Sequence, residues 1–110
     1  MMYLYDMETE ARYFPSAMKL IDLYSHTENI PLYPLTCNHS IEEEILVVCE
    51  DNGCFCGCIY LLHHQNAILA IYMSSEDLYA IGKKRRTIRE LLSAQYPDKK
   101  VFLDVKHLSK

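Results

Sequence analysis

The chain has 110 residues, of which 50% are hydrophobic and 24% are charged, a balance typical of one folded domain rather than a disordered segment. Its formal net charge of -4 argues against a general nucleic-acid binder. No apolar run reaches the roughly 18 residues of a membrane helix, and no secretory signal opens the sequence. We therefore expect a cytoplasmic protein that does not enter the membrane.

The first third of the sequence predicts a short strand followed by a helix. Residues 2–5 have strand character, and residues 16–29 carry apolar side chains at the i, i+3, i+4, i+7 spacing of one helix face. These side chains, which we expect to pack on a sheet, are Ala17, Leu20, Ile21 and Tyr24. Two prolines within 29–40 predict an extended connector, and 40–44 are expected to form a short helical turn.

The rest of the chain predicts antiparallel strands and then a helical crossover. Residues 45–50 and 54–62 flank Asp-Asn-Gly, a sequence typical of a tight hairpin because Asn-Gly tolerates positive φ angles. Residues 67–73 form a third, almost wholly apolar strand, which predicts cover on both faces. A helix over 83–95, with Ile88, Leu91 and Leu92 on one side, leads to a parallel strand over 100–105.

These elements predict an α/β (α+β) fold. The sheet is expected to be mixed and mostly antiparallel, with about five strands and with helices packed on it.

Five cysteines, three of them at alternate positions, raise the question of a metal site. A structural zinc site needs ligands in turn-forming pairs such as C-x-x-C, and the sequence has none. The alternation instead predicts that Cys54, Cys56 and Cys58 lie in a row on one face of a strand as small packed hydrophobes. A metal site that includes His63 or His64 is the alternative.

Four segments resemble, in order and spacing, successive pieces of the GNAT-type N-acetyltransferases over roughly residues 28–105. They are NIPLYPL, EDNGCFCGCIYLL, SSEDLYAIGKKRRTIREL and AQYPDKKVFLDV. The resemblance implies one GNAT-like domain over 1–110 that lacks the C-terminal helix and last two strands of that fold. It also implies acetyl-CoA as cofactor, with its pantetheine arm in a wedge between the strands at 67–73 and 100–105.

In that family a segment Q/R-x-x-G-x-G/A holds the cofactor's pyrophosphate on backbone amides at a helix N-terminus. The corresponding segment here is residues 79–84, in which Gly82 keeps the pattern, Tyr79 departs from it, and Lys84 would crowd the phosphate. The cofactor-contacting positions implied by the resemblance are Met73, Ser74, Tyr79, Gly82, Lys83, Lys84 and Arg85.

The basic run 83–86 allows two interpretations. If a glycine loop precedes the helix, these cations lie in its first turn, where the helix dipole disfavours them unless an anion is bound. Alternatively, one long helix begins with a cap at Ser74 or Ser75, and the run is solvated and mid-helix, with Gly82 costing about 1 kcal/mol.

Groups suited to catalysis are few. Tyr72 is the only ionisable side chain of the strand at 67–73, and His64 precedes that strand and is of the residue type that most often serves as a general base. Tyr72 and His64 are therefore the candidate catalytic residues, although a histidine beside a turn is more commonly exposed and inert. The family's tyrosine acid lies on a later helix, and only residues 106–110 follow the fifth strand here.

Two functions from different classes follow. We expect a shortened, catalytically impaired GNAT-like domain that binds a protein partner, as a subunit or as an inhibitor such as a phage anti-defence protein. The alternative is an active acetyl-CoA-dependent N-acetyltransferase that completes its acceptor site in a homodimer through the open sheet edge at 101–105. A nucleic-acid binder using residues 83–86 is a third interpretation, which the acidic remainder of the chain disfavours.

Overall fold

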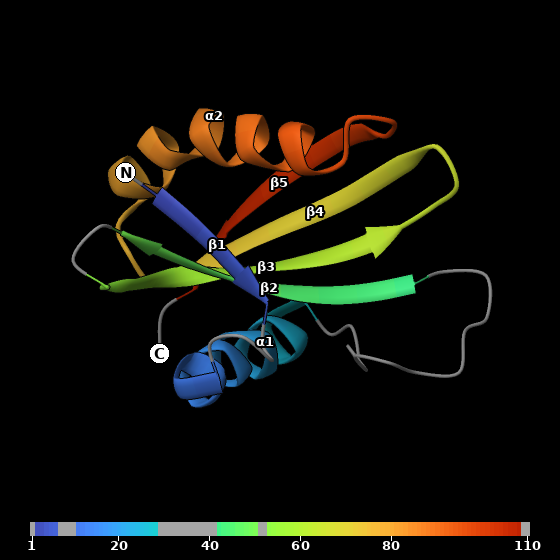
Figure 1. Cartoon of the computed structure of the whole chain (residues 1–110). Coiled ribbons are helices and arrows are strands. Elements are labelled where there is room, and N and C mark those ends of the chain that lie inside the picture. The colour runs from blue at the N-terminus through green and yellow to red at the C-terminus, as the bar shows by residue number, and fades with distance from the viewer. Residues whose placement is uncertain (1, 7–10, 29–41, 51–52, 109–110) are drawn as a thin grey trace.

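A computed structural model of the protein describes residues 2–6, 11–28, 42–50 and 53–108. They form a five-stranded sheet with an α-helix on each face, which confirms the expected α+β class (Figure 1). In chain order the elements are β1 (Met2–Asp6), a 3-10 turn (Ala11–Tyr13), α1 (Phe14–Glu28), β2 (Glu42–Glu50), β3 (Phe55–His63), β4 (Ala67–Ser74), α2 (Leu78–Gln95) and β5 (Lys100–His107). Among these residues, no helix has the length and apolar character to cross a membrane.

The strands lie side by side in sequence order. Each of β1, β2 and β3 is antiparallel to the strand that follows it in the sheet, whereas β5 is parallel to β4. The parallel register runs without a shift from the pair Ala67 and Lys100 to the pair Ser74 and His107. Since α2 connects these two strands, the predicted helical crossover is confirmed.

Each helix buries one apolar face on the sheet. The predicted buried face of α1 is confirmed, because its residues are at most 7% exposed: Ala17, Leu20, Ile21 and Tyr24. On the opposite side α2 buries Ile81, Ile88 and Leu92, while Leu91 is only partly buried. The inner face of α2 therefore begins at Ile81, earlier than the sequence analysis placed it.

The hairpin between β2 and β3 turns where the sequence predicts it. Gly53 has a φ of 76°, a left-handed conformation that other residues rarely adopt, and its N–H donates to the carbonyl of Glu50 (2.8 Å). The start of β2 differs from expectation. The helical turn expected over 40–44 is wrong at 42–44, which pair with β3 because the antiparallel ladder continues to Glu42 opposite His63. Residues 40–41 and the rest of the connector expected over 29–40 lie outside the described residues.

A β-bulge in β3 separates the cysteines. Val48 pairs with Gly57, but the next residue of β2 pairs with Phe55, so Cys56 is an extra residue on β3. The bulge places Cys56 in the core under α2, whereas Cys58 packs in the core under α1. The prediction that the cysteines lie in a row on one face was therefore wrong, because it assumed unbroken alternation.

Candidate functional site

The start of α2 occupies the place where the phosphate loop was expected. Asp77 is the N-cap of this helix, and its carboxylate accepts the N–H of Ala80 (2.8 Å). Gly82 therefore lies within the helix, on an open surface where an added Cβ would have no neighbour within 4 Å. The glycine loop was therefore wrong, and the alternative of one helix that contains Gly82 and the basic run is confirmed. Only its cap differs from the expected Ser74 or Ser75, because the Asp77 side chain accepts the Ala80 amide.

The cations of the basic run lie beyond the first turn of α2 and point to different surroundings. Lys83 is exposed, and its Nζ lies 5.1 Å from the centre of the exposed Tyr79 ring. Arg85 donates from Nη2 to the carbonyl of Leu103 in β5 (3.4 Å). Lys84 alone turns inward, with 12% of its side chain exposed. The run is therefore not a single cradle for an anion.

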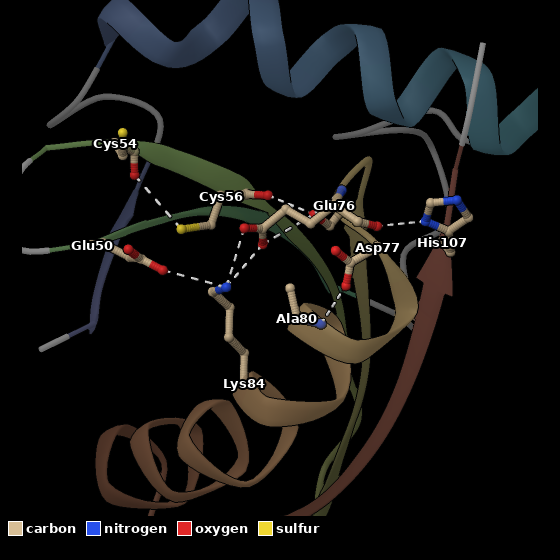
Figure 2. Close-up of polar contacts among 9 residues, drawn as sticks. Glu50, Cys54, Cys56, Glu76, Asp77, Ala80, Lys84 and His107 are labelled. Carbon is tan, nitrogen blue, oxygen red and sulfur yellow. Dashed lines mark hydrogen bonds and ion pairs between the residues drawn. The ribbon is translucent and has the colours of Figure 1, made fainter.

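Lys84 reaches a pair of carboxylates at the end of the sheet (Figure 2). Its Nζ lies 3.3 Å from Glu50 Oε1, at the end of β2, and 3.1 Å from Glu76 Oε1, in the turn before α2. Ligand atoms of Glu50, Cys56 and Glu76 lie within 4.8 Å of one another, a spacing that a cation could bridge. The Lys84 ammonium already supplies a positive charge to these carboxylates, so we assign this cluster a structural role.

The charges in this cluster affect its ionisable groups. Burial alone would lower the pKa of Lys84, but its hydrogen bonds to Glu76 and Glu50 and the negative charge of Glu76 raise it above the usual value. Burial, together with the charges of Glu76 and Glu50, raises the pKa of the Cys56 thiol to about 12. Cys56 is therefore a protonated thiol at neutral pH rather than a nucleophile.

The turn between β4 and α2 is tied to the strands on either side of β4. The Ser74 hydroxyl donates to the carbonyl of Cys56 in β3 (2.7 Å) and accepts the N–H of Glu76 (3.0 Å). The Glu76 carbonyl accepts a hydrogen bond from His107 Nδ1 in β5, as Figure 2 shows. Finally, the Leu108 N–H donates to the carbonyl of Ser74 (2.8 Å). These bonds close the junction of β4 and β5 at its C-terminal end.

This junction and the cap together give acyl-CoA a poor fit. The strands expected to flank the pantetheine arm are neighbours, as predicted, but their register is continuous to their last residues. A ligand arm between them would have to displace backbone hydrogen bonds. At the helix N-terminus, the Asp77 carboxylate takes an amide that a diphosphate would need, and it adds a like charge.

The remaining candidate residues are not gathered at one place. Met73 and Ser74 are fully buried, whereas Tyr79 is 75% exposed on the surface of α2. Tyr72 is also fully buried, and its hydroxyl has no hydrogen-bond partner among the described residues. Burial raises the pKa of Tyr72. His64 is exposed in the turn before β4, where its N–H donates to the carbonyl of Ala67, the first residue of that strand. Tyr72 lies five residues further along β4, so the two candidate catalytic residues are roughly 16 Å apart along the strand, at about 3.3 Å per residue.

A second polar network, at the other end of β2 and β3, escaped the sequence analysis. His63 is 9% exposed, and its Nε2 lies 3.0 Å from Glu44 Oε1, which also accepts the Tyr96 hydroxyl (2.7 Å). Lys99 Nζ lies 3.3 Å from His63 Nδ1. This network was missed because residues 40–44 were expected to form a helical turn and the second strand of the hairpin was expected to end at residue 62. The longer hairpin register and the end of α2 bring these side chains together.

A pocket of about 420 Å³ lies between α1 and the strand ends. Leu20 and Leu23 of α1, Phe55 and Leu108 form its apolar walls. None of the cofactor or catalytic candidates lines it, so it adds nothing to the case for acyl transfer.

Fold and site together define a five-stranded α+β domain with charged networks at both ends of its central hairpin. Comparison of the chain with protein-family models, with curated proteins and with solved structures gives no match. The resemblance to GNAT-type acetyltransferases therefore stays a prediction from the sequence.

Proposed function

We propose that this chain is a GNAT-like domain that acts by binding a protein rather than by transferring an acetyl group. The observation that carries the proposal is the closed junction between β4 and β5, which runs to Ser74 and His107 and ends with the Leu108 N–H on the Ser74 carbonyl. An acyl-CoA enzyme of the expected kind needs room between these strands, and here backbone hydrogen bonds fill it.

The side chains support the same proposal. Proton transfer to or from an amine requires an ionisable group within hydrogen-bond reach of the reacting atoms. Tyr72 is enclosed in the core, and His64 lies beyond the other end of β4. Lys84, which could have met a phosphate, is held by Glu50 and Glu76.

The binding surface that we propose is the outer edge of β5 with the sheet face beside it. On its outer side β5 has no neighbouring strand among the described residues. Phe102 of β5 is 49% exposed, and Leu69, its partner in the register with β4, is 38% exposed. Large apolar side chains beside an open strand edge are typical of surfaces that associate with another chain. A role as an inhibitor or as a subunit would both use such a surface.

Titration calorimetry with acetyl-CoA tests the proposal. We expect no heat of binding at a ligand concentration of about 1 mM, well above the micromolar range in which enzymes commonly bind substrates. The matched variants are Lys83→Glu, which changes an exposed cation, and Gly82→Ala, which adds only a methyl group at an open position. Micromolar binding that either variant weakens would refute the proposal and restore the acetyltransferase interpretation.

A further inference from the structure

The backbone groups of β5 alternate between β4 and the open edge. The N–H groups of Lys100 and Leu108 donate toward β4, to the carbonyls of Asn66 (3.0 Å) and Ser74 (2.8 Å). Since successive residues of a strand direct their N–H and C=O groups to opposite sides, the odd-numbered residues direct theirs outward. Arg85 Nη2 reaches the carbonyl of Leu103, as this alternation requires.

The side chains of β5 alternate as well, in the perpendicular direction. Val101, Leu103 and Val105 pack in the core under α2. The residues between them face the other side of the sheet, where Lys100, Phe102 and Asp104 are exposed. Lys100 Nζ lies 5.2 Å from the centre of the Phe102 ring. The Asp104 carboxylate accepts the N–H of Val105 (3.0 Å) and lies 3.7 Å from Lys106 Nζ, contacts that a partner strand would have to compete with. A cation, an aromatic residue and an anion thus alternate along this face of the edge strand.

This row is complementary to itself when reversed. If two copies of β5 pair antiparallel about a two-fold axis at Phe102, the two Phe102 side chains are directly opposite each other. Lys100 of each copy then faces Asp104 of the other. Neighbouring registers are worse, because centring on Leu103 sets Lys100 against Lys106, and centring on Asp104 sets two aspartates face to face.

The backbone fits the same register. With the axis at Phe102, Val101 of one copy faces Leu103 of the other, and both residues direct their N–H and C=O groups outward. Each such pair can exchange both hydrogen bonds. A hydrogen bond from the partner strand would replace the one that Arg85 now donates to the Leu103 carbonyl. That bond is long (3.4 Å) and comes from an exposed side chain, so little is lost.

We infer that the partner of the β5 edge is a second copy of this chain, joined antiparallel with Phe102 on the two-fold axis. The inference rests on the proposed function, since it names the partner of the surface proposed there. A two-fold contact of this kind is isologous, so one charge pattern serves both subunits, and the sheets of the copies become continuous. Phe102 and Leu69 of each copy then form one apolar strip across the axis.

Sedimentation analysis of charge-reversal variants tests the register. We expect the wild-type chain to self-associate between roughly 5 and 500 µM, the range for a small interface. Lys100→Asp and Asp104→Lys should each weaken the dimer by about 10- to 30-fold, because cross-strand attraction becomes repulsion at two symmetric places. The double swap, Lys100→Asp with Asp104→Lys, should restore it. Lys83→Asp on exposed α2 is the control and should change nothing.

A cysteine cross-link provides a second, independent readout. Directly opposed residues of a non-hydrogen-bonded pair have Cα atoms about 4.5 Å apart, within reach of a disulfide. Phe102→Cys should therefore give a covalent dimer under mild oxidation, and the wild-type chain, treated alike, controls for Cys54, which is exposed.

The outcomes separate this inference from the proposed function. The inference is overturned if the wild-type chain stays monomeric at about 500 µM, the weak end of the expected range of association. It is also overturned if the double swap fails to restore the dimer. If the same samples still show no heat with acetyl-CoA, the proposed non-catalytic role stands. Acetyl-CoA binding would instead remove the proposed function, whatever the oligomeric state.

Discussion

The glycines at 57 and 82 should respond to alanine in opposite directions. At Gly57 in β3 an added Cβ would lie 2.2 Å from the carbonyl oxygen of Met73 and 2.9 Å from Cε1 of Tyr72. Contacts below 3.0 Å require the neighbours to move, and the closer neighbour is backbone of the adjacent strand. At Gly82, by contrast, nothing lies within 4 Å, and the residue is mid-helix.

The expected magnitudes follow from these surroundings. Overpacking of a core typically costs 1–3 kcal/mol, and a clash with β4 backbone places Gly57→Ala near the upper end, about 2–3 kcal/mol. Gly82→Ala gains about 1 kcal/mol, because alanine is the better helix former and no contact opposes it. At roughly 4 °C per kcal/mol, the melting temperatures should differ from wild type by about -10 °C and +4 °C respectively.

Urea unfolding followed by circular dichroism, with thermal melts alongside, measures both variants against wild type. A Gly57→Ala protein that melts within about 2 °C of wild type would show that β3 and β4 are not in such close contact there. Destabilisation by Gly82→Ala would mean that Gly82 is not in a regular helix, and the phosphate-loop interpretation would regain its basis.

Three further changes test the buried groups. Burial raises the pKa of the Cys58 thiol to about 12, so the folded state holds this proton at pH values where the unfolded chain releases it. The free energy of unfolding should therefore fall by about 1.4 kcal/mol per pH unit above roughly pH 9. Urea unfolding from about pH 8 to 10.5 measures this pH dependence, which should be correspondingly shallower in Cys58→Ala. Equal pH dependence in the two proteins would contradict the raised pKa of Cys58. Lys84→Met should lower the free energy of unfolding by about 1–2 kcal/mol, because Glu50 and Glu76 lose the cation that pairs with them, and an unchanged urea midpoint would show that these ion pairs do not stabilise the fold. Tyr96→Phe removes the hydroxyl that donates to Glu44 and should cost about 1 kcal/mol, whereas an unchanged unfolding midpoint would show that water replaces this bond.

Local patterns in the sequence predicted much of the fold. The i, i+3, i+4, i+7 spacing identified the inner face of α1, and Asn-Gly identified the hairpin at Gly53. The crossover through α2 then required β5 to be parallel to β4. Each of these rules depends on residues that are neighbours in the chain or on a strong handedness preference, so a single sequence is enough to predict these elements.

The site was less predictable because it depends on register and helix phase. The bulge at Cys56 exists only in the pairing of β2 with β3, and it decides which core that thiol enters. Likewise, a helix rotates about 100° per residue, so the start of α2 decides which cation turns inward. Ile81 and Ile88, seven residues apart, already marked the inner face, and Lys84 lies between them. Recognising Asp77 as the N-cap would therefore have predicted that Lys84 is the cation that turns inward.

The order of strands also has a consequence for how the protein reaches this structure. β2, β3 and β4 are joined by short turns, whereas β5 meets β4 only after the whole of α2, and β1 meets β2 only after α1. Closing long loops costs entropy before their contacts form, so non-local pairings are slow. We expect β2, β3 and β4 to pair early in folding and both outer strands to join later. Docking of β1 and β5 should therefore be the rate-limiting step.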